Sequence, residues 1–180
     1  MSKNIEIKAA VHGPETLISH INSLPISTTA EFFQHDTFFH VPYGRLKVRR
    51  QEGKMAEVIY YVRENQAGPK SSYYIRIHLS DQFQRIFRPI AKLWPRRGDV
   101  HKKRHLFIFD KTRIHLDQVE GLGWYLEFEV LLDKNQTSED GQEIATYLLR
   151  TLQVDESDLI SEAYIDLLSS KEFNIQNKSN

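Results

Sequence analysis

The sequence predicts an α+β protein in which eight antiparallel strands close into a β-barrel that helices cover. Three observations lead to this fold class. Eight segments are rich in Val, Ile, Tyr and Phe, as strands are. Several of them alternate charged and apolar residues with a period of two, and amphipathic segments are available to cover the apolar side. An antiparallel sheet of about eight strands tends to curl or close.

The strands are predicted from β-branched and aromatic runs that turn-like segments interrupt. Glu120-Gly121-Leu122-Gly123 is one such break, and breaks of this kind fit meander connections. The predicted strands are 3–10, 31–41, 44–51, 55–64, 72–80, 100–109, 112–120 and 124–132.

Four helices are predicted from apolar residues at helical spacing. Pro14 suits the first turn of the first helix, and Asp81 is the candidate N-cap of the second. Each helix is expected to cover an apolar face of the sheet. The predicted helices are 14–24, 81–94, 138–152 and 158–170.

The charged residues of the strands fall in one phase and the apolar residues in the other. Arg45, Lys47 and Arg49 alternate with Leu46 and Val48. For a single strand, this pattern is typical of a sheet with one face on the core and the other in water. Because ionic residues dominate the polar phase of strand after strand, we instead expect an ionic lumen. The same phase contains Asn4, Glu6, Lys8, Lys102, Arg104, Arg113, His115, Asp117, Glu127 and Glu129.

Length and composition indicate one compact domain. The chain has 180 residues, of which 40% are hydrophobic, enough for a core. We expect a single domain over residues 1–173 and a flexible tail over 174–180. No segment approaches the roughly 18 apolar residues of a membrane span, and the N-terminus lacks a signal-peptide layout. A cytoplasmic protein with no membrane contact is therefore expected.

The residue types present limit the possible chemistry. The absence of cysteine excludes disulfides, thiolate metal sites and cysteine nucleophiles.

The net charge is zero, but residues 1–113 contain 20 of the 24 Lys and Arg residues and 10 of the 24 Asp and Glu residues. Basic strands beside acidic ones would bind both a polyanion and a divalent cation. A nucleic-acid binder usually keeps a net basic surface, so nucleic acid is not an expected partner. An acidic C-terminal region that is merely solvated is the alternative.

Five segments in order resemble the CYTH superfamily, the triphosphate tunnel enzymes. Ile5-Glu6-Ile7-Lys8 resembles the family's E-x-E-x-K strand, and Lys102-Lys103-Arg104 resembles its K-x-R strand. The similarity spans roughly residues 3–170 and is closest to the class IV adenylyl cyclase branch. The segment Tyr164-Ile165-Asp166-Leu167-Leu168 also resembles the C-terminal helix of that branch. The other three matching segments are Gln34-His35-Asp36-Thr37-Phe38-Phe39, Arg45-Leu46-Lys47-Val48-Arg49, and Thr112-Arg113-Ile114-His115-Leu116-Asp117 together with Gly121-Leu122-Gly123-Trp124-Tyr125-Leu126-Glu127-Phe128-Glu129, which resembles the family's acidic hairpin.

The resemblance implies a tunnel that binds a triphosphate with basic side chains and places Mg²⁺ or Mn²⁺ on carboxylates. A triphosphate needs several converging Lys and Arg donors, and hard divalent cations prefer carboxylate oxygens. Arg76 is a weaker phosphate candidate, and His115 is a possible tunnel donor. The expected triphosphate-binding residues are Lys8, Arg45, Lys47, Arg49, Arg63, Lys102, Arg104 and Arg113, with Lys8, Lys102 and Arg104 as catalytic candidates, and the expected metal ligands are Glu6, Asp117, Glu127 and Glu129.

Two classes of function fit this sequence. The first is a metal-dependent enzyme that converts ATP to cyclic AMP and pyrophosphate or hydrolyses a triphosphate. The second is a non-catalytic module that binds a triphosphate or another polyanion. The second is favoured by Asn4, which stands where the family has the first Glu of its motif, although an amide oxygen can still ligate a cation.

The identity of the ligand and the oligomeric state stay open. The expected partner is a nucleoside, organic or inorganic triphosphate, because no segment outside the tunnel is a readable pocket for the attached group. The protein is expected to be a monomer or a homodimer, for which Phe32, Phe33, Phe38 and Phe39 are candidate contacts. The segment 68–72 lacks the spacing of a nucleotide phosphate loop and is interpreted as a hairpin.

Overall fold

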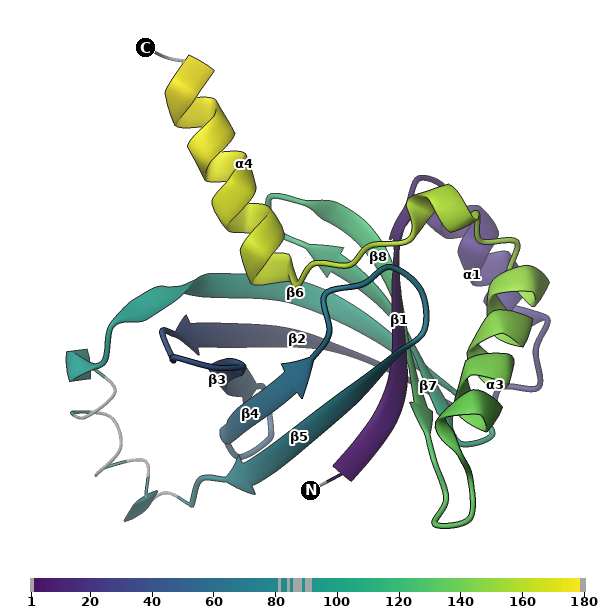
Figure 1. The fold of residues 1–180 in the computed structure, drawn as a ribbon, viewed down its shortest axis with the longest axis horizontal. Coiled ribbons are helices and arrows are strands. Elements are labelled where there is room, and N and C mark those ends of the chain that lie inside the picture. The colour runs from purple at the N-terminus through teal and green to yellow at the C-terminus, as the bar shows by residue number, and fades with distance from the viewer. Residues whose placement is uncertain (1, 81, 84, 86–88, 90–91, 179–180) are drawn as a thin grey trace.

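The computed structural model describes residues 2–80, 82–83, 85, 89 and 92–178. Eight antiparallel strands form a closed barrel in the order β1-β5-β4-β3-β2-β6-β7-β8, which confirms the predicted fold class (Figure 1). The elements are β1 (Ser2–Val11), α1 (Pro14–Asn22), β2 (Thr28–Phe39), β3 (Arg45–Gln51), β4 (Glu57–Arg63), β5 (Lys70–His78), β6 (Arg96–Phe109), β7 (Thr112–Val119), β8 (Gly123–Leu131), α3 (Ser138–Thr151), the 3₁₀ turn η1 (Glu156–Asp158) and α4 (Tyr164–Lys178).

The predicted strands overlap the observed strands, and the largest difference is at the start of β6. The strand begins at Arg96, four residues earlier than predicted. The strand passes through Gly98 because β2 and β6 pair from Thr28 to Phe39. A register shift between Phe38 and Phe39 accommodates the irregular end of this pairing.

The last predicted helix begins six residues later than expected. Residues before it are extended because Leu159 pairs with Ala9 and the Ile160 N–H donates to the Lys8 carbonyl (2.8 Å). The helix α4 then continues to Lys178, through most of the predicted tail. Seven of the fourteen residues of the predicted helix 81–94 lie outside the described residues, namely 81, 84, 86–88 and 90–91.

The first and third predicted helices are confirmed with their boundaries nearly as expected. Pro14 occupies the first turn of α1. The helix α3 begins with a capping box in which the side chains of Thr137 and Asp140 each accept the other's backbone N–H. None of the helices in the described part of the chain is long and apolar enough to cross a membrane.

The helices α1 and α3 cover the outer face of β1, β7 and β8, where they form the main core (Figure 1). The apolar phase of these strands, including Ile5, Ile114 and Phe128, is buried there. Gly141 permits the close approach of α3, because a Cβ at this position would lie 2.6 Å from Ile5 and 2.7 Å from Leu132. The charged phase of the same strands consequently points into the barrel.

A second cluster of buried residues lies at one end of the barrel. It joins the first turn of α4 to the strand ends and contains Phe38, Val100, Val119, Tyr125, Ala163, Tyr164 and Ile165. Beyond this turn, α4 extends away from the barrel (Figure 1). The opposite end of the barrel is formed by the start of β1 and by the turns that follow β3 and β6.

The covering of the barrel by helices is less complete than predicted. On the outer face of β5, Ile75 and Ile77 are exposed among the described residues. The phenylalanines proposed as a dimer contact are also separated, because period-two alternation places Phe32 and Phe38 inside and Phe33 and Phe39 outside. Of these four side chains, only Phe33 is largely exposed, at 65%.

The packing of α3 gives a direct test of this architecture. Leu148 is fully buried in the main core, whereas the adjacent Tyr147 is exposed. Leu148→Ala is expected to lower the free energy of unfolding by about 2–5 kcal/mol, because it removes apolar contacts and leaves a cavity. Urea denaturation followed by circular dichroism measures this. Tyr147→Ala serves as the control, and equal destabilisation by the two variants would contradict the assigned packing.

Candidate functional site

The lumen of the barrel is an ionic cavity built from the inward phase of its strands. Alternation makes each strand contribute every second side chain, so charged groups separated in sequence meet in layers along the barrel axis. The cavity has a volume of about 90 Å³. Its lining residues are Asn4, Glu6, Lys8, Asp36, Phe38, Lys47, Arg49, Ile59, Tyr61, Arg63, Ser72, Tyr74, Arg76, Val100, Lys102, Arg104, Glu127, Glu129, Ala163 and Tyr164.

Asp117 on β7 organises the first group of cations. Its carboxylate accepts hydrogen bonds from Lys102 Nζ (2.7 Å) and from Nε and Nη2 of Arg104 (both 2.6 Å). The Tyr164 hydroxyl donates a further bond to the same carboxylate (3.1 Å). Burial raises the pKa of Asp117, but Arg104 and Lys102 outweigh this effect and hold the pKa below its usual range. Asp117 is therefore ionised and fully occupied by its partners.

Asp36 on β2 organises the second group of cations in the same way. It accepts from Lys47 Nζ (2.7 Å) and from Nε and Nη2 of Arg49 (both 2.8 Å). Burial opposes ionisation, but Arg49 and Lys47 hold the pKa of Asp36 well below its usual value. Burial lowers the pKa of Lys47 to about 8, helped by the nearby Arg49. The two aspartates thus fix four basic side chains from neighbouring strands.

Glu6, Glu127 and Glu129 lie on the adjacent strands β1 and β8. Glu6 accepts from Arg63 Nη1 (2.7 Å), and Glu127 accepts from Arg104 Nη2 (3.1 Å). Burial raises the pKa of Glu6 more than Arg63 lowers it. For Glu127, burial is outweighed by Lys8 and Arg104, which hold its pKa well below the usual range. The cavity therefore holds carboxyl groups of different proton affinity.

Of the two cavity lysines that lie over the Tyr164 ring, Lys8 is nearer to it than Lys102. Its Nζ lies 3.9 Å from the centre of the Tyr164 ring and donates to the Glu162 carbonyl (3.3 Å). Burial lowers the pKa of Lys8 to about 7, with Arg63 acting in the same direction and Glu127 against it. This lysine lacks a tight carboxylate partner among the described residues, so an anion that enters the tunnel would offset the energetic cost of burying its charge.

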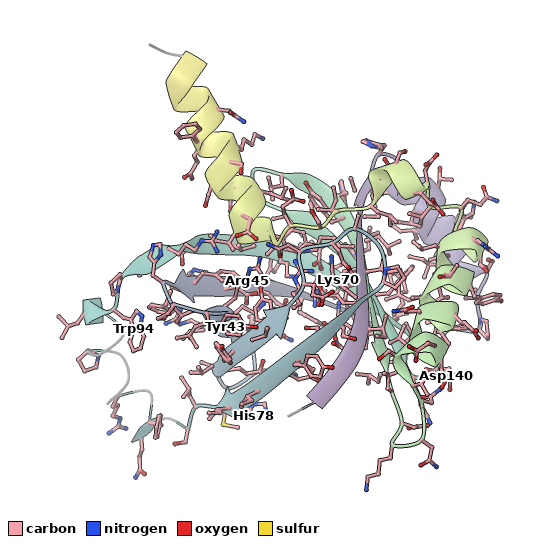
Figure 2. All side chains as sticks on the ribbon, in the orientation of Figure 1. Tyr43, Arg45, Lys70, His78, Trp94 and Asp140 are labelled. Carbon is pink, nitrogen blue, oxygen red and sulfur yellow. The ribbon has the colours of Figure 1, made fainter. Side chains whose placement is uncertain are left out.

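The segment before α4 is attached firmly to the end of the barrel where Tyr164 lies. Lys70, which is fully buried, donates to the carbonyls of Gln66 (2.8 Å), Ile160 (3.2 Å) and Ser161 (3.4 Å). Asp166 accepts from Arg45 Nη2 (2.8 Å) and from Arg97. Figure 2 shows Arg45 and Lys70 on the barrel below α4. These contacts hold Tyr164 over the lumen.

The oxygen donors of the cavity fit a divalent cation that also binds phosphate. Asn4, Glu6, Glu127 and Glu129 line the same space, and Glu6 lies directly opposite Glu129 in the strand register. Like charges in such a pair repel each other unless a cation intervenes. The buried Asn4 Oδ1 has no hydrogen-bond partner. No three acidic or histidine side chains of the described residues are gathered into a complete metal site. This set matches Mg²⁺ or Mn²⁺, which take few carboxylates and complete their shell with phosphate and water.

The structure brings together most of the residues predicted for the site. Lys8, Lys47, Arg49, Arg63, Lys102 and Arg104 line the inner cavity with Glu6, Glu127, Glu129 and the weaker candidate Arg76. Arg113 and His115 instead line a second, outer cavity of about 230 Å³. Arg45 is engaged by Asp166 and Asn65 beside α4, away from the lumen. Asp117 lies behind the cations that it binds and does not line either cavity.

Asp36, Lys70 and Tyr164 were not predicted as site residues. Asp36 follows Gln34 in the inward phase of β2, so the alternation could have identified it. Lys70 belongs to the segment 68–72 that is interpreted as a hairpin, but the connection between β4 and β5 is 64–69 and Lys70 is the first residue of β5. Its burial depends on the carbonyls of residues 160 and 161, a contact that no local sequence pattern encodes. The role of Tyr164 likewise depends on tertiary packing.

The role of Asp36 predicts a large loss of stability on its removal. Asp36→Ala leaves Lys47 and Arg49 buried without their carboxylate, which typically costs about 3–5 kcal/mol of unfolding free energy. Asp133→Ala is the control, because the Lys111–Asp133 ion pair is exposed and its loss should cause no measurable change. Urea denaturation of both variants tests the difference. Similar midpoints for Asp36→Ala and the unaltered protein would contradict the assigned role.

Comparisons with known proteins agree with this architecture. The family model of the CYTH domain matches residues 2–164. None of the curated proteins with which the sequence was compared matches it. The PH1012 protein of Pyrococcus horikoshii is similar in structure, with a TM-score of 0.79 and 23% sequence identity over 91% of this chain and 98% of that one.

Two further similar structures have been described with an activity. A candidate adenylate cyclase from Vibrio parahaemolyticus has a TM-score of 0.72 and 17% identity, with 94% of this chain and 99% of that chain covered. A candidate adenylyl cyclase from Hippeastrum, described as having a dominant triphosphatase activity, has a TM-score of 0.64 and 14% identity, with 93% and 96% covered. At these identities the two structures establish a common fold. The family match over residues 2–164 establishes that this chain belongs to the CYTH domain family.

Proposed function

We propose that the protein is a divalent-metal-dependent hydrolase of a triphosphate bound in the tunnel. The observation that carries this proposal is the convergence of seven Lys and Arg side chains and three glutamates on one cavity. Such a set matches a polyanion that brings a hard cation with it. Membership of the CYTH domain family agrees with it. The seven basic residues are Lys8, Lys47, Arg49, Arg63, Arg76, Lys102 and Arg104.

The basic residues would bind and orient the phosphates. Arg49 and Arg104 are already fixed by bidentate contacts to Asp36 and Asp117, so they need little reorganisation when a ligand arrives. Preorganised cations in a water-poor cavity stabilise charge that develops during phosphoryl transfer. Lys8 and Lys102, which flank the Tyr164 ring, are placed to neutralise the innermost phosphate.

Glu6, Glu127 and Glu129 are the proposed metal ligands, with the Asn4 side-chain oxygen as an additional donor. A bound Mg²⁺ or Mn²⁺ would supply charge neutralisation on the phosphate oxygens and Lewis-acid activation. Asp117, predicted as a fourth ligand, is assigned a positioning role here because Lys102, Arg104 and Tyr164 occupy its oxygens.

The cavity sizes favour hydrolysis over cyclisation. Cyclisation needs the ribose and the α-phosphate beside the metal carboxylates, whereas hydrolysis needs only water and the terminal phosphate. Glu6 and Glu127 line only the inner cavity of about 90 Å³, whereas Glu129 lines both that cavity and the outer one of about 230 Å³. An organic group that occupies the larger space directs its terminal phosphate toward these glutamates. The triphosphatase activity described for the Hippeastrum protein is compatible with this assignment.

A non-catalytic module is the second candidate, and Asn4 is the observation that favours it. An amide binds a divalent cation more weakly than a carboxylate does, because it carries no charge. Among the described residues, Asn4 replaces one acidic donor in a cavity that still contains three glutamates.

The central experiment separates these functions. The purified protein is incubated with ATP, thiamine triphosphate or inorganic triphosphate in Mg²⁺, Mn²⁺ or chelator, and the products are resolved by chromatography. Metal-dependent release of orthophosphate is expected. Cyclic AMP with pyrophosphate would identify a cyclase instead, and tight binding without turnover would identify a binding module.

Removal of one proposed metal ligand should separate catalysis from binding. Glu127→Gln keeps the shape of the side chain and leaves Arg104 bound to Asp117, so folding should be preserved. We expect metal-dependent turnover to fall by about 100-fold, the scale of one lost electrostatic contact in an active site. Triphosphate binding in chelator should be retained, since a negative charge has been removed. Glu143→Gln, on the exposed face of α3, is the matched control. Unchanged turnover in Glu127→Gln would contradict the metal assignment.

Above neutral pH, the protein should take up protons when it binds a triphosphate. The ligand-free pKa of Lys8 is about 7, and a nearby triphosphate would raise it by favouring the charged ammonium. Between these two pKa values the complex holds more protons than the free protein, so affinity should fall as the pH rises above about 7. Calorimetry at pH 8 in buffers of different ionisation enthalpy measures the uptake. Lys8→Arg, which stays charged, should show less uptake. Absence of uptake in the unaltered protein would contradict the prediction.

A further inference from the structure

Two histidines lie side by side on the outer surface of the barrel, away from the lumen. His35 on β2 is directly opposite His101 on β6 in the strand register. Their neighbours Asp36 and Lys102 line the inner cavity, so alternation places both imidazoles outside. The two rings are stacked, with their centres 4.1 Å apart and their planes tilted by 23°. Both are accessible, because the side chain of His35 is 36% exposed and His101 is exposed.

A carboxylate holds the ring of His35 in place. Its Nε2 lies 2.8 Å from Oδ1 of Asp99, which also accepts a hydrogen bond from the Thr37 hydroxyl (2.8 Å). Asp99 forms an ion pair with Arg96, so it is ionised and acts only as an acceptor, and His35 Nε2 is the donor. In the neutral ring, Nδ1 then keeps its lone pair. A histidine that donates one ring N–H to a carboxylate and offers its other nitrogen has the arrangement typical of metal ligands.

His101 can supply the second nitrogen ligand. Its ring forms no hydrogen bond or ion pair within the described part of the chain, and its contact there is the stacking with His35. A metal ion lies about 2 Å from each imidazole nitrogen, so two ligand nitrogens must be about 3 Å apart. Rings that already stack at 4.1 Å reach this spacing by a small rotation of the exposed His101 ring, whose outer torsion is soft.

The surface beside the two rings is hollow. A cavity of about 390 Å³ is lined by both histidines and by the exposed Glu52. It leaves room for an ion and for the waters that complete its shell. Because no three acidic or histidine side chains among the described residues form a complete site, the protein supplies two nitrogen ligands here. Imidazole with water suits copper, nickel and zinc, whereas magnesium prefers oxygen ligands.

We propose that His35 and His101 form a site for one divalent transition-metal ion of the copper, nickel and zinc class on the outer face of β2 and β6. The site is separate from the lumen, since neither ring lines the inner cavity, and it does not depend on the proposed function. A bound ion joins the two strands that carry Asp36, Lys102 and Arg104. It therefore stabilises the folded barrel relative to the unfolded chain, in which the two imidazoles are far apart.

His105 is the internal control for this site. It lies on the same face of β6, four residues from His101, and its Nδ1 is 3.0 Å from a carboxylate oxygen of Glu31. The residue opposite it on β2 is that glutamate and not a histidine. At about 3.3 Å per residue, it is roughly 13 Å from His101, too far to share an ion. His105 thus has the carboxylate contact of His35 without a partner imidazole.

The test is a titration of the untagged protein with nickel chloride, measured by calorimetry in an excess of Mg²⁺ that competes for the lumen carboxylates. One nickel ion per chain is expected, and Cu²⁺ should bind more tightly than Ni²⁺. His101→Ala should weaken nickel binding at least about 10-fold, since even the loss of an outer-shell partner has an effect of that size. His105→Ala should leave the affinity unchanged.

A second readout is the thermal unfolding midpoint, followed by circular dichroism. Nickel should raise the midpoint of the unaltered protein and of His105→Ala but not that of His101→Ala. Because His101 is exposed, its replacement should leave the metal-free midpoint unchanged. His35→Gln removes the other imidazole and should abolish the nickel-dependent rise as well.

Three results would overturn the inference. Equally tight nickel binding by His101→Ala would place the ion elsewhere, such as on the lumen glutamates. Equal weakening by His105→Ala and His101→Ala would indicate nonspecific coordination by surface histidines. No nickel or copper binding by the unaltered protein would leave the stacked pair with a packing role alone. None of these results bears on turnover of a triphosphate, which is measured separately.

Discussion

Compensation of buried charge is the constraint on which the rest of this structure depends. An ion transferred to a protein interior costs several kcal/mol even after relaxation, unless a partner of opposite charge is close. The barrel meets this requirement by pairing charges across adjacent strands: Asp36 on β2 with Lys47 and Arg49 on β3, and Asp117 on β7 with Lys102 and Arg104 on β6. Closure of the sheet gives every strand a neighbour on both sides, so the compensation can continue around the lumen.

The same pairing prepares the lumen for an anion. The two aspartates hold the arginines at fixed positions, while Lys8 is left with a carbonyl and an aromatic ring as its nearest contacts. The tunnel therefore combines arginines held in place by aspartates with one lysine, Lys8, that has no close carboxylate partner among the described residues. Preorganised groups of this kind favour charged ligands because their ordering has already taken place during folding. Stability and binding thus depend on one network, and a substitution in it would be expected to affect both.

Much of the fold and part of the site could be predicted because alternation is a local property. The ionic phase of residues 4–8 and 47–49 identifies which side chains face the lumen, and the structure confirms the barrel that this phase implies. Contacts between distant segments could not be predicted in this way. Lys70 is buried by carbonyls 90 residues away, Arg45 is drawn to Asp166, and Asp117 is covered by its own partners. Each depends on how the start of α4 meets the barrel.

The register shift at the end of β2 has a consequence for how this fold can change in evolution. Inserting one residue within a strand would exchange its lumen and exterior faces along the rest of that strand. The shift between Phe38 and Phe39 lies beyond Asp36, the last charged lumen residue of the strand, so the ionic layers are undisturbed. Length changes are consequently expected to be selected against in the strands and tolerated in the connections. Such a barrel can diverge widely in sequence while the number of residues in each strand stays nearly constant.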